Sequence, residues 1–158
     1  MGIEIERKFL IKSDEWRQPA IGTRYCQGYL TTAVEPTVRV RIAGDRGFIT
    51  VKSATAGMSR LEFEYEIPLA DADLMLVRLC AKPLIEKTRY RVDHGGLTWE
   101  IDEFAGENAG LIIAEVELES HEQQIELPVW VGREVTGDPR YYNACLAKNP
   151  FKSWAGEA

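Results

Sequence analysis

Charged and hydrophobic residues alternate with a period of two in six stretches of the chain. In the first stretch, the hydrophobic residues Ile3, Ile5 and Phe9 occupy odd-numbered positions, whereas Glu4 and Glu6 occupy even-numbered positions. Successive side chains of a β-strand point to opposite faces, so this pattern predicts strands with one apolar face and one charged face. The six stretches are residues 3–10, 38–42, 61–67, 87–92, 99–102 and 114–119.

Turn residues separate these strands as an antiparallel sheet requires. Residues 43–47 (Ala-Gly-Asp-Arg-Gly) and residues 93–96 (Asp-His-Gly-Gly) each lie between two strand-like runs. Such glycine-containing turns are typical of β-hairpins. The chain is therefore expected to be a meander of antiparallel strands.

Helical signals are fewer. Asp71-Ala72-Asp73 could cap a short helix over residues 74–79, and residues 120–123 could start another turn. A third helix is expected from about residue 137 to residue 146, opened by Asp138-Pro139. The predicted fold class is α+β, mainly antiparallel β, with peripheral helices.

The charged faces segregate by sign, which ordinary solvated faces do not. The ordinary interpretation of each alternating strand is an exposed polar face over an apolar core. Closing the sheet with its charged face inward would instead make a barrel whose interior is lined by acids and bases. The pairs are Glu4/Glu6, Arg39/Arg41, Glu62/Glu64, Lys87/Arg89, Glu100/Asp102 and Glu115/Glu117.

Length and net charge narrow the class of protein. The chain has 158 residues, 45% of them hydrophobic, which suits one domain over residues 1–158. Its formal net charge of −6 would repel nucleic acid and anionic lipid. No apolar run approaches the ~20 residues of a membrane span, and the N-terminal residues do not resemble a signal peptide. We expect neither a nucleic-acid partner nor a membrane partner.

The cysteines indicate a reducing compartment. Cys26, Cys80 and Cys145 are odd in number and widely spaced. A chain of this size does not need disulfides, and the spacing does not match a zinc site. The expectation is free thiols in the cytoplasm.

A cavity lined by carboxylates and cations suits a polyphosphate with a divalent metal. Paired carboxylates are hard oxygen ligands for Mg²⁺ or Mn²⁺, and Lys and Arg bind phosphate oxygens. No glycine-rich GxxxxGK(S/T) loop occurs in the sequence, so side chains must hold the phosphates. Together, the paired carboxylates and the Lys and Arg side chains favour a phosphoryl-transfer reaction.

These residues resemble a known family. Glu4-Ile5-Glu6-Arg7-Lys8 is similar to the ExExK signature of the CYTH superfamily, the triphosphate tunnel metalloenzymes. The resemblance covers residues 3 to about 147. It is closest to the compact bacterial tripolyphosphatases, and its further motifs are Gln27-Gly28-Tyr29-Leu30, Val38-Arg39-Val40-Arg41, Thr50-Val51-Lys52, Arg60-Leu61-Glu62-Phe63-Glu64, Glu86-Lys87-Thr88-Arg89-Tyr90, Trp99-Glu100-Ile101-Asp102 and Glu115-Val116-Glu117.

The resemblance implies a closed eight-stranded barrel that holds a triphosphate and one or two divalent metals, with residues 138–147 as a C-terminal helix that plugs or lids the tunnel. It implies metal binding by Glu4, Glu6, Glu115 and Glu117, with Glu62 and Glu64 as candidates for a second metal or its waters. It implies a triphosphate clamp made of Lys8, Arg39, Arg41, Lys52, Lys87 and Arg89.

Three further residues have two interpretations each. Asp102 and Glu100 could bind metal or could neutralise the neighbouring bases. Tyr29 matches a tyrosine near the family's site and could tune hydrolysis, or it could pack at the barrel rim.

The general base stays open at this point. A second metal recruited by Glu62 or Glu64 would activate water for in-line attack. His94 and His121 are expected to be ordinary surface residues. The base is then a carboxylate, a metal-bound hydroxide or a lysine with a lowered pKa, for which Lys87 is the candidate.

The leading reaction is hydrolysis of inorganic tripolyphosphate to pyrophosphate and phosphate. The alternatives are thiamine triphosphatase, class IV adenylate cyclase, and a non-catalytic module that binds polyphosphate or nucleotide. An organic substrate would need an aromatic shelf, which could come from Trp16, Tyr25, Trp130 and Trp154. An exposed apolar face or the tail at Phe151 and Trp154 could support a homodimer.

Overall fold

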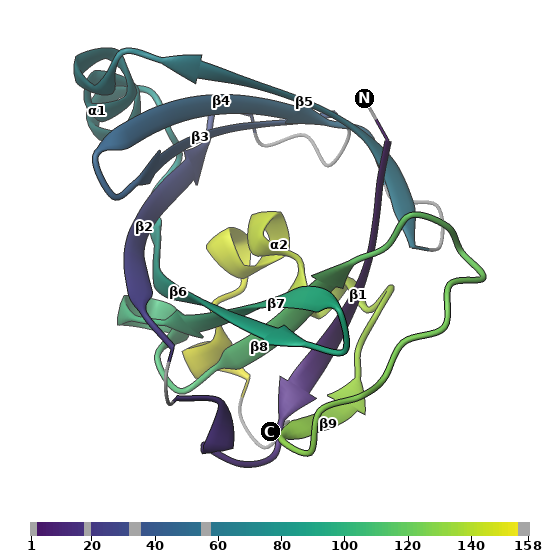
Figure 1. Cartoon of the computed structure of the whole chain (residues 1–158). Helices are drawn as coiled ribbons and strands as arrows, with labels where there is room; N and C mark the ends of the chain where they lie inside the picture. The colour runs from purple at the N-terminus through teal and green to yellow at the C-terminus, as the bar shows by residue number, and fades with distance from the viewer. Residues whose placement is uncertain (1–2, 18–19, 32–35, 55–57, 155–158) are drawn as a thin grey trace.

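Eight antiparallel strands close into a barrel in the computed structural model of the chain (Figure 1). The structure describes residues 3–17, 20–31, 36–54 and 58–154. The barrel order is β5-β4-β3-β2-β6-β7-β8-β1, and β1 pairs again with β5. The strands are β1 (Ile3–Ile11), β2 (Gly22–Tyr29), β3 (Thr37–Ala43), β4 (Arg46–Lys52), β5 (Ser59–Ile67), β6 (Ile85–His94), β7 (Leu97–Phe104) and β8 (Ile112–Glu117). All six strands predicted from alternation are present.

Strand β1 closes the barrel. Its first residues pair with β5, with Ile3 opposite Leu61 and Ile5 opposite Ser59. Further along, Phe9 pairs with a ninth strand, β9 (Val131–Glu134), which lies outside the barrel. The other edge of β1 pairs with β8. One strand therefore joins three segments that are far apart in the sequence.

The predicted hairpins are confirmed. Ala43 pairs with Arg46 across a two-residue loop in which Gly44 has φ of 63°. His94 pairs with Leu97 across Gly95 and Gly96, which both have positive φ. Two consecutive positive φ angles match the twist of tight hairpins, and glycine adopts them without steric cost.

The helices differ from the sequence expectation at their boundaries. Helix α1 spans Leu69–Arg78 with Pro68 at its N-cap, so Asp71-Ala72-Asp73 lies inside the helix and the predicted cap is wrong. Proline can precede a helix because its φ already suits the entry and it has no N–H to satisfy.

The predicted C-terminal helix is two pieces. A 3-10 turn, η3 (Pro139–Tyr141), is followed by α2 (Asn143–Lys148), because Tyr142 is extended between them. Asp138 accepts a hydrogen bond from the backbone N–H of Arg140, as expected for the opening of the first piece. Further short turns are η1 (Glu15–Arg17), η2 (Gly106–Asn108) and η4 (Phe151–Ser153). Residues 120–123 form a turn rather than a helix.

The apolar faces of the strands pack outward. One core lies between the barrel wall and the β9 region around Phe9, Trp99 and Trp130. A second core holds the C-terminal segment through Leu146 and Trp154. A third, built from Val40, Ala72 and Leu76, joins α1 to β3 and β4.

The outer face of β5 is an exception to this outward packing. Leu61, Phe63 and Tyr65 are exposed there. The expected cover of helices therefore holds for β3 and β4 but not for the whole barrel. No helix in the described ranges combines the length and apolar composition needed to cross a membrane.

Candidate functional site: a charged tunnel

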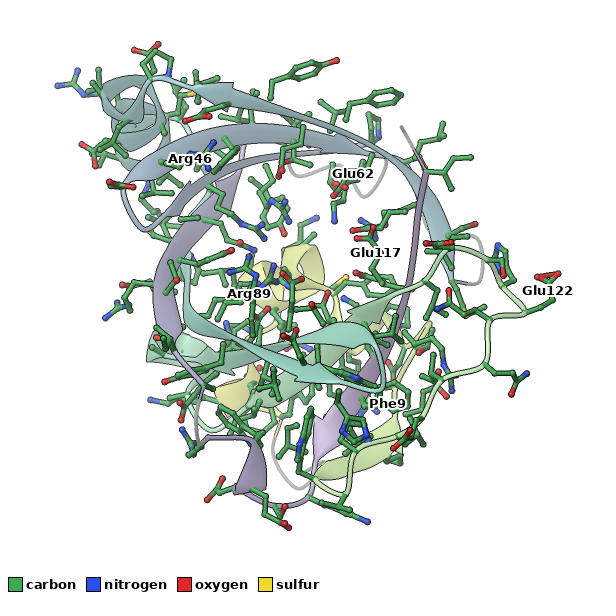
Figure 2. The ribbon with its side chains drawn as sticks, in the orientation of Figure 1. Phe9, Arg46, Glu62, Arg89, Glu117 and Glu122 are labelled. Carbon is green, nitrogen blue, oxygen red and sulfur yellow. The ribbon has the colours of Figure 1, made fainter. Side chains whose placement is uncertain are left out.

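The inward side chains of all eight barrel strands line a cavity of about 760 Å³, here called the tunnel. Figure 2 shows Glu62, Arg89 and Glu117 pointing into it, whereas Phe9 points to the outer core. Asp102, by contrast, has no exposed surface and is absent from the lining of this cavity. The predicted site residues that line the tunnel are Glu4, Glu6, Lys8, Tyr29, Arg39, Arg41, Lys52, Glu62, Glu64, Lys87, Arg89, Glu100, Glu115 and Glu117.

One side of the tunnel is acidic. We call it the acidic wall, and it consists of Glu4, Glu6, Glu62, Glu115 and Glu117. The register places Glu6 opposite Glu117 and Lys8 opposite Glu115. The Nζ atom of Lys52 lies 3.2 Å from a Glu4 oxygen and 3.1 Å from a Glu62 oxygen. Lysines thus separate some of the carboxylates, but carboxylates are in excess.

Burial and neighbouring charges shift the pKa values of three of these acids. Burial raises the pKa of Glu6 to about 8, with Glu115 and Glu4 adding to the shift while Lys8 and Lys52 oppose it. Burial also raises the pKa of Glu117, and Glu4 adds to this effect. Burial acts on Glu115 in the same direction, yet Lys8 and Arg89 hold its pKa below the ordinary value.

A divalent cation fits the acidic wall. The donors are hard carboxylate oxygens, and the pKa of Glu6 is raised by burial first and then by neighbouring carboxylates, whose charge a cation would compensate. Among the residues that the structure describes, no three acidic, histidine or cysteine side chains already form a metal cluster. A metal here would therefore keep several water or phosphate ligands, as Mg²⁺ commonly does.

Glu64 belongs to a different neighbourhood. Its carboxylate accepts a hydrogen bond from the Thr50 hydroxyl at 2.9 Å and lies 3.6 Å from Arg39. It therefore faces the cations rather than the acidic wall.

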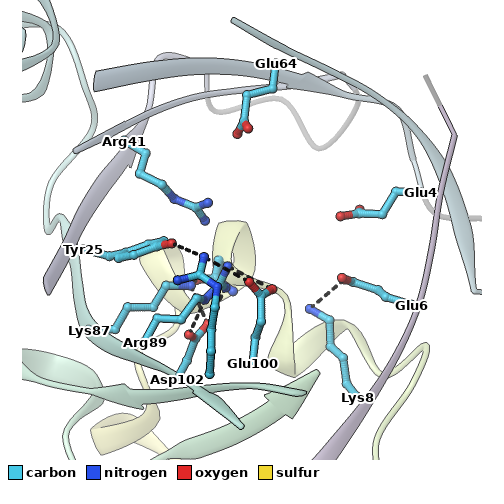
Figure 3. Close-up of polar contacts among 12 residues, drawn as sticks. Glu4, Glu6, Lys8, Tyr25, Arg41, Glu64, Lys87, Arg89, Glu100 and Asp102 are labelled. Atoms are coloured by element: carbon cyan, nitrogen blue, oxygen red, sulfur yellow. Dashed lines mark hydrogen bonds and ion pairs between the residues drawn. The ribbon is translucent and has the colours of Figure 1, made fainter. Parts of the chain in front are cut away.

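The opposite side of the tunnel is basic. We call it the basic wall, and it consists of Arg39, Arg41, Lys87 and Arg89, all of them buried. Figure 3 shows Glu4 and Glu6 reaching into the interior opposite Arg41. Burial lowers the pKa of Arg41 to about 9, with Arg39 and Arg89 adding to the effect. A concentrated positive wall of this kind suits an anion with several charges.

Two buried groups hold the basic wall together. Asp102 accepts hydrogen bonds from Lys87 Nζ at 2.7 Å and from Arg89 Nε and Nη2 at 2.7 and 2.9 Å. The ring of Tyr25 has Arg41 and Arg89 at 4.8 and 4.9 Å from its centroid. Both carboxylate oxygens of Asp102 already accept hydrogen bonds from these cations. This arrangement favours the interpretation that Asp102 neutralises the bases over the interpretation that it binds metal.

Lys87 has an unusual environment for a lysine. Burial lowers its pKa to about 7; Asp102 opposes the shift, and Arg89 and Arg41 add to it. A lysine whose pKa lies near neutrality can exchange a proton during a reaction.

Two residues near Lys87, Asn143 and Gln27, were not among the site residues predicted from the sequence. Asn143 Oδ1 accepts hydrogen bonds from Lys87 Nζ at 3.0 Å and from Gln27 Nε2 at 2.9 Å. Gln27 Oε1 in turn accepts one from Arg41 Nε at 2.7 Å. Gln27 shares the inward parity of Tyr29 on β2, so the strand pattern could have found it. Asn143 reaches the site only through the docking of α2, which strand alternation does not predict.

The other aromatic and histidine residues lie as follows. Trp16 and Trp130 belong to the outer core near β9, and Trp154 packs on Tyr141 and Phe151. Of the four residues proposed as an aromatic shelf, only Tyr25 lines the tunnel. His94 lies at the end of β6, 3.3 Å from Glu126, and His121 is exposed. Neither histidine contributes to the tunnel lining.

The chain is similar to several characterised proteins. Residues 2–142 match the CYTH domain family. A protein named inorganic triphosphatase from Acetivibrio thermocellus is 51% identical over 154 residues, which cover 98% of this chain and 99% of that protein. An inorganic triphosphatase from Nitrosomonas europaea is 40% identical over 150 residues, which cover 91% and 96%. A crystal structure of an inorganic triphosphatase superposes with a TM-score of 0.67 at 34% identity, covering 90% of this chain and 96% of that one.

Proposed function

The chain belongs to the CYTH domain family, and from this premise we propose that it hydrolyses inorganic tripolyphosphate to pyrophosphate and phosphate. Two relatives that align over nearly their full length carry the name inorganic triphosphatase. The observation that carries the proposal is a tunnel in which a basic wall faces an acidic wall. Such a site neutralises a highly charged anion from both sides once a metal is bound.

The aromatic residues of the lining favour an inorganic substrate. A nucleobase or a thiamine ring would need an accessible aromatic face. The rings of Tyr25, Phe48 and Tyr142 lie against cations, and Tyr29 exposes only 9% of its surface. The tunnel thus offers charges for phosphates rather than a shelf for an organic group.

The cations of the tunnel would bind the phosphate oxygens. Arg39, Arg41 and Arg89 supply forked donors, and the lysines supply compact charges. We propose Lys8, Lys52 and the protonated form of Lys87 as the lysines of this clamp, and Tyr29 as a neighbour that tunes hydrolysis. Because Asp102 already holds Lys87 and Arg89 in place, these side chains need little reorganisation when the substrate enters.

The acidic wall would hold the cofactor, which we propose is Mg²⁺ or Mn²⁺. Glu4, Glu6, Glu115 and Glu117 are the proposed ligands, with Glu62 and Glu64 as partners of a second ion or of its waters. When bound, the metal would neutralise phosphate charge and lower the pKa of a coordinated water.

Lys87 is the residue we propose for proton transfer. As water attacks the terminal phosphorus, the new P–O bond forms and the bridging P–O bond breaks, with its electron pair remaining on pyrophosphate. Neutral Lys87 accepts the proton of the attacking water. The lowered pKa of Lys87 supports this role, because part of the population is unprotonated near neutrality.

Three predictions from the sequence stay predictions: one domain over residues 1–158, a homodimer, and a cytoplasmic location. Cys26, Cys80 and Cys145 are free thiols.

The test is phosphate release from tripolyphosphate, ATP, thiamine triphosphate and pyrophosphate, each measured in parallel with Mg²⁺, with Mn²⁺ and with excess chelator. Wild type is compared with Glu4→Gln and Lys87→Ala, and with Glu119→Gln as a matched control at an exposed position beyond β8. We expect metal-dependent turnover of tripolyphosphate that both tunnel variants lose and the control retains.

The other outcomes identify the alternatives. Accumulation of cyclic AMP from ATP would indicate a cyclase, and preference for thiamine triphosphate would indicate an organic triphosphatase. Binding of tripolyphosphate without turnover under any condition would make the tunnel a receptor and would overturn the proposed enzyme.

A further inference from the structure

We infer that Asn143, supported by Gln27, is a positioning residue that aims the Lys87 amine into the tunnel. The inference rests on the proposed function, because Lys87 is the group to which that function assigns the proton. Asn143 lies on α2, whereas Asp102, the other hydrogen-bond partner of Lys87, lies on the barrel strand β7.

The direction of the hydrogen bonds is fixed by residues that can only donate. Arg41 has no acceptor atom, so the side chain of Gln27 must turn its oxygen toward Arg41 Nε. The amide nitrogen of Gln27 then faces Asn143, which must present its oxygen. That same oxygen is therefore the acceptor available to Lys87.

This polarity decides how the Lys87 amine is oriented. A neutral amine has two hydrogens and one lone pair. Asp102 and Asn143 accept at 2.7 and 3.0 Å, so both hydrogens are engaged with the wall. The lone pair of the nitrogen is then left to face the tunnel, because Lys87 is part of the tunnel lining. Without the second acceptor, the amine could rotate about its Cε–Nζ bond and direct a hydrogen at the substrate instead.

The supports of Asn143 are rigid. Gln27 has no exposed surface, and Leu146, which also has none, anchors α2 in the second core. Asn143 is also the first residue of α2, directly after the extended Tyr142, so its backbone is fixed at a helix start. A side chain held this way can impose its geometry on a neighbour.

The test replaces Asn143 by Leu, which has a similar size and no acceptor. The matched control is Asn149→Leu at the other end of α2, where the side chain accepts a hydrogen bond from Ser153 rather than from a tunnel residue. We expect Asn143→Leu to lower kcat for tripolyphosphate by about tenfold or more, with KM changed by less than about twofold. Asn149→Leu should keep wild-type kcat and KM.

A double-mutant cycle separates positioning from general damage. In a Lys87→Ala background, Asn143→Leu should not lower the small residual kcat, measured at high enzyme concentration, any further, because Asn143 acts through Lys87. An equal loss in both backgrounds, or wild-type kcat in Asn143→Leu, would overturn the inference while leaving the triphosphatase proposal intact.

A third measurement does not depend on turnover. The ¹⁵N NMR signal of Lys87 Nζ is assigned by its absence in Lys87→Ala. The hydrogens on this nitrogen should exchange with solvent at least about tenfold faster in Asn143→Leu than in wild type. Unchanged exchange would show that Asn143 does not restrain the amine. This readout stays decisive even if the wild-type protein fails to hydrolyse tripolyphosphate, which would overturn only the proposed function.

Discussion

Asp102 is a carboxylate with no exposed surface and two cationic neighbours. We expect Asp102→Asn to lower the free energy of unfolding by about 3 kcal/mol, because Lys87 and Arg89 would stay buried without their counter-charge. Urea unfolding at pH 7 checks this. The control is Glu103→Gln, at a residue on the same strand as Asp102. It removes a partly exposed ion pair with Arg17 and should lower the free energy of unfolding by less than about 1 kcal/mol. Equal losses in the two variants would contradict the burial argument.

The burial of Asp102 also predicts that the stability of the protein depends on pH. Burial alone would raise the pKa of Asp102, but Arg89 and Lys87 hold it well below its ordinary value. A carboxylate whose pKa is lowered by folding stabilises the protein above its unfolded pKa of about 3.9, and this stabilisation is lost as the pH falls toward the folded value. The stability gap between wild type and Asp102→Asn should therefore narrow from pH 5 to pH 3. A constant gap would show that folding does not shift the pKa of Asp102.

Tyr25 leads to a prediction about binding. Its ring lies against Arg41 and Arg89, and cation–π contacts of this kind contribute about 1 kcal/mol. We expect Tyr25→Leu to weaken tripolyphosphate binding roughly fivefold in calorimetry. Tyr25→Phe retains the ring face and should bind like wild type. A loss in the Phe variant would assign the effect to the hydroxyl, which accepts a hydrogen bond from Arg91.

At this scale, strand parity explains what the sequence could predict. Glu4 and Glu6, or Arg39 and Arg41, must share a face once their segments are strands. The sequence does not indicate that Asp102 is enclosed while Glu100 borders the tunnel, because that difference depends on the neighbouring strands. Nor does it place Asn143 beside Lys87.

The elements themselves were predicted unevenly for a physical reason. Alternation is strong where every second residue is charged, as in β1 and β6. It is weak in β9, whose four residues lie on an outer edge. That the strands close into a barrel was implied by the family resemblance, since local periodicity does not encode which strands are neighbours.

Helix α1 depends on a glycine beneath it. A Cβ atom at Gly47 would lie 2.8 Å from the Cβ of Ala72 and 3.2 Å from the carbonyl oxygen of Ile67. Neither neighbour is a flexible side-chain end, so we expect Gly47→Ala to push α1 outward and to destabilise the protein by about 1–3 kcal/mol. Thermal unfolding measures this.

The control for this prediction removes the clash from the other side. Gly47→Ala combined with Ala72→Gly should cost less than the sum of the two single changes, because the contact between the two methyl groups disappears. Strict additivity would mean that the helix and the strand do not touch at this point.

For the molecule as a whole, the tunnel divides into walls of opposite sign, and the acidic one is overcharged. Because folding raises the pKa of Glu6, ionisation of this residue opposes folding when no metal is bound. We expect Glu6→Gln to stabilise the protein at pH 8 in chelator by on the order of 1 kcal/mol. It should also abolish the rise in Tm that Mg²⁺ or Mn²⁺ causes in wild type.

Glu107→Gln is the control, since Glu107 is exposed on η2, outside the tunnel lining. It should behave like wild type with and without metal. A Glu6→Gln variant that metal still stabilises to the full extent would remove Glu6 from the proposed ligands.

The dual pairing of β1 has a consequence for synthesis on the ribosome. Strand β1, which carries Glu4, Glu6 and Lys8, leaves the ribosome before the other barrel strands. Its partners within the barrel are β5 and β8, about 55 and 110 residues later. Contacts so distant along the chain form late, because closing long loops is slow. A nascent chain that ends before residue 112 has the whole basic wall but only part of the acidic one. The ability to bind phosphate should therefore precede the ability to hold metal, and the enzyme would become catalytic only when its last barrel strand is released.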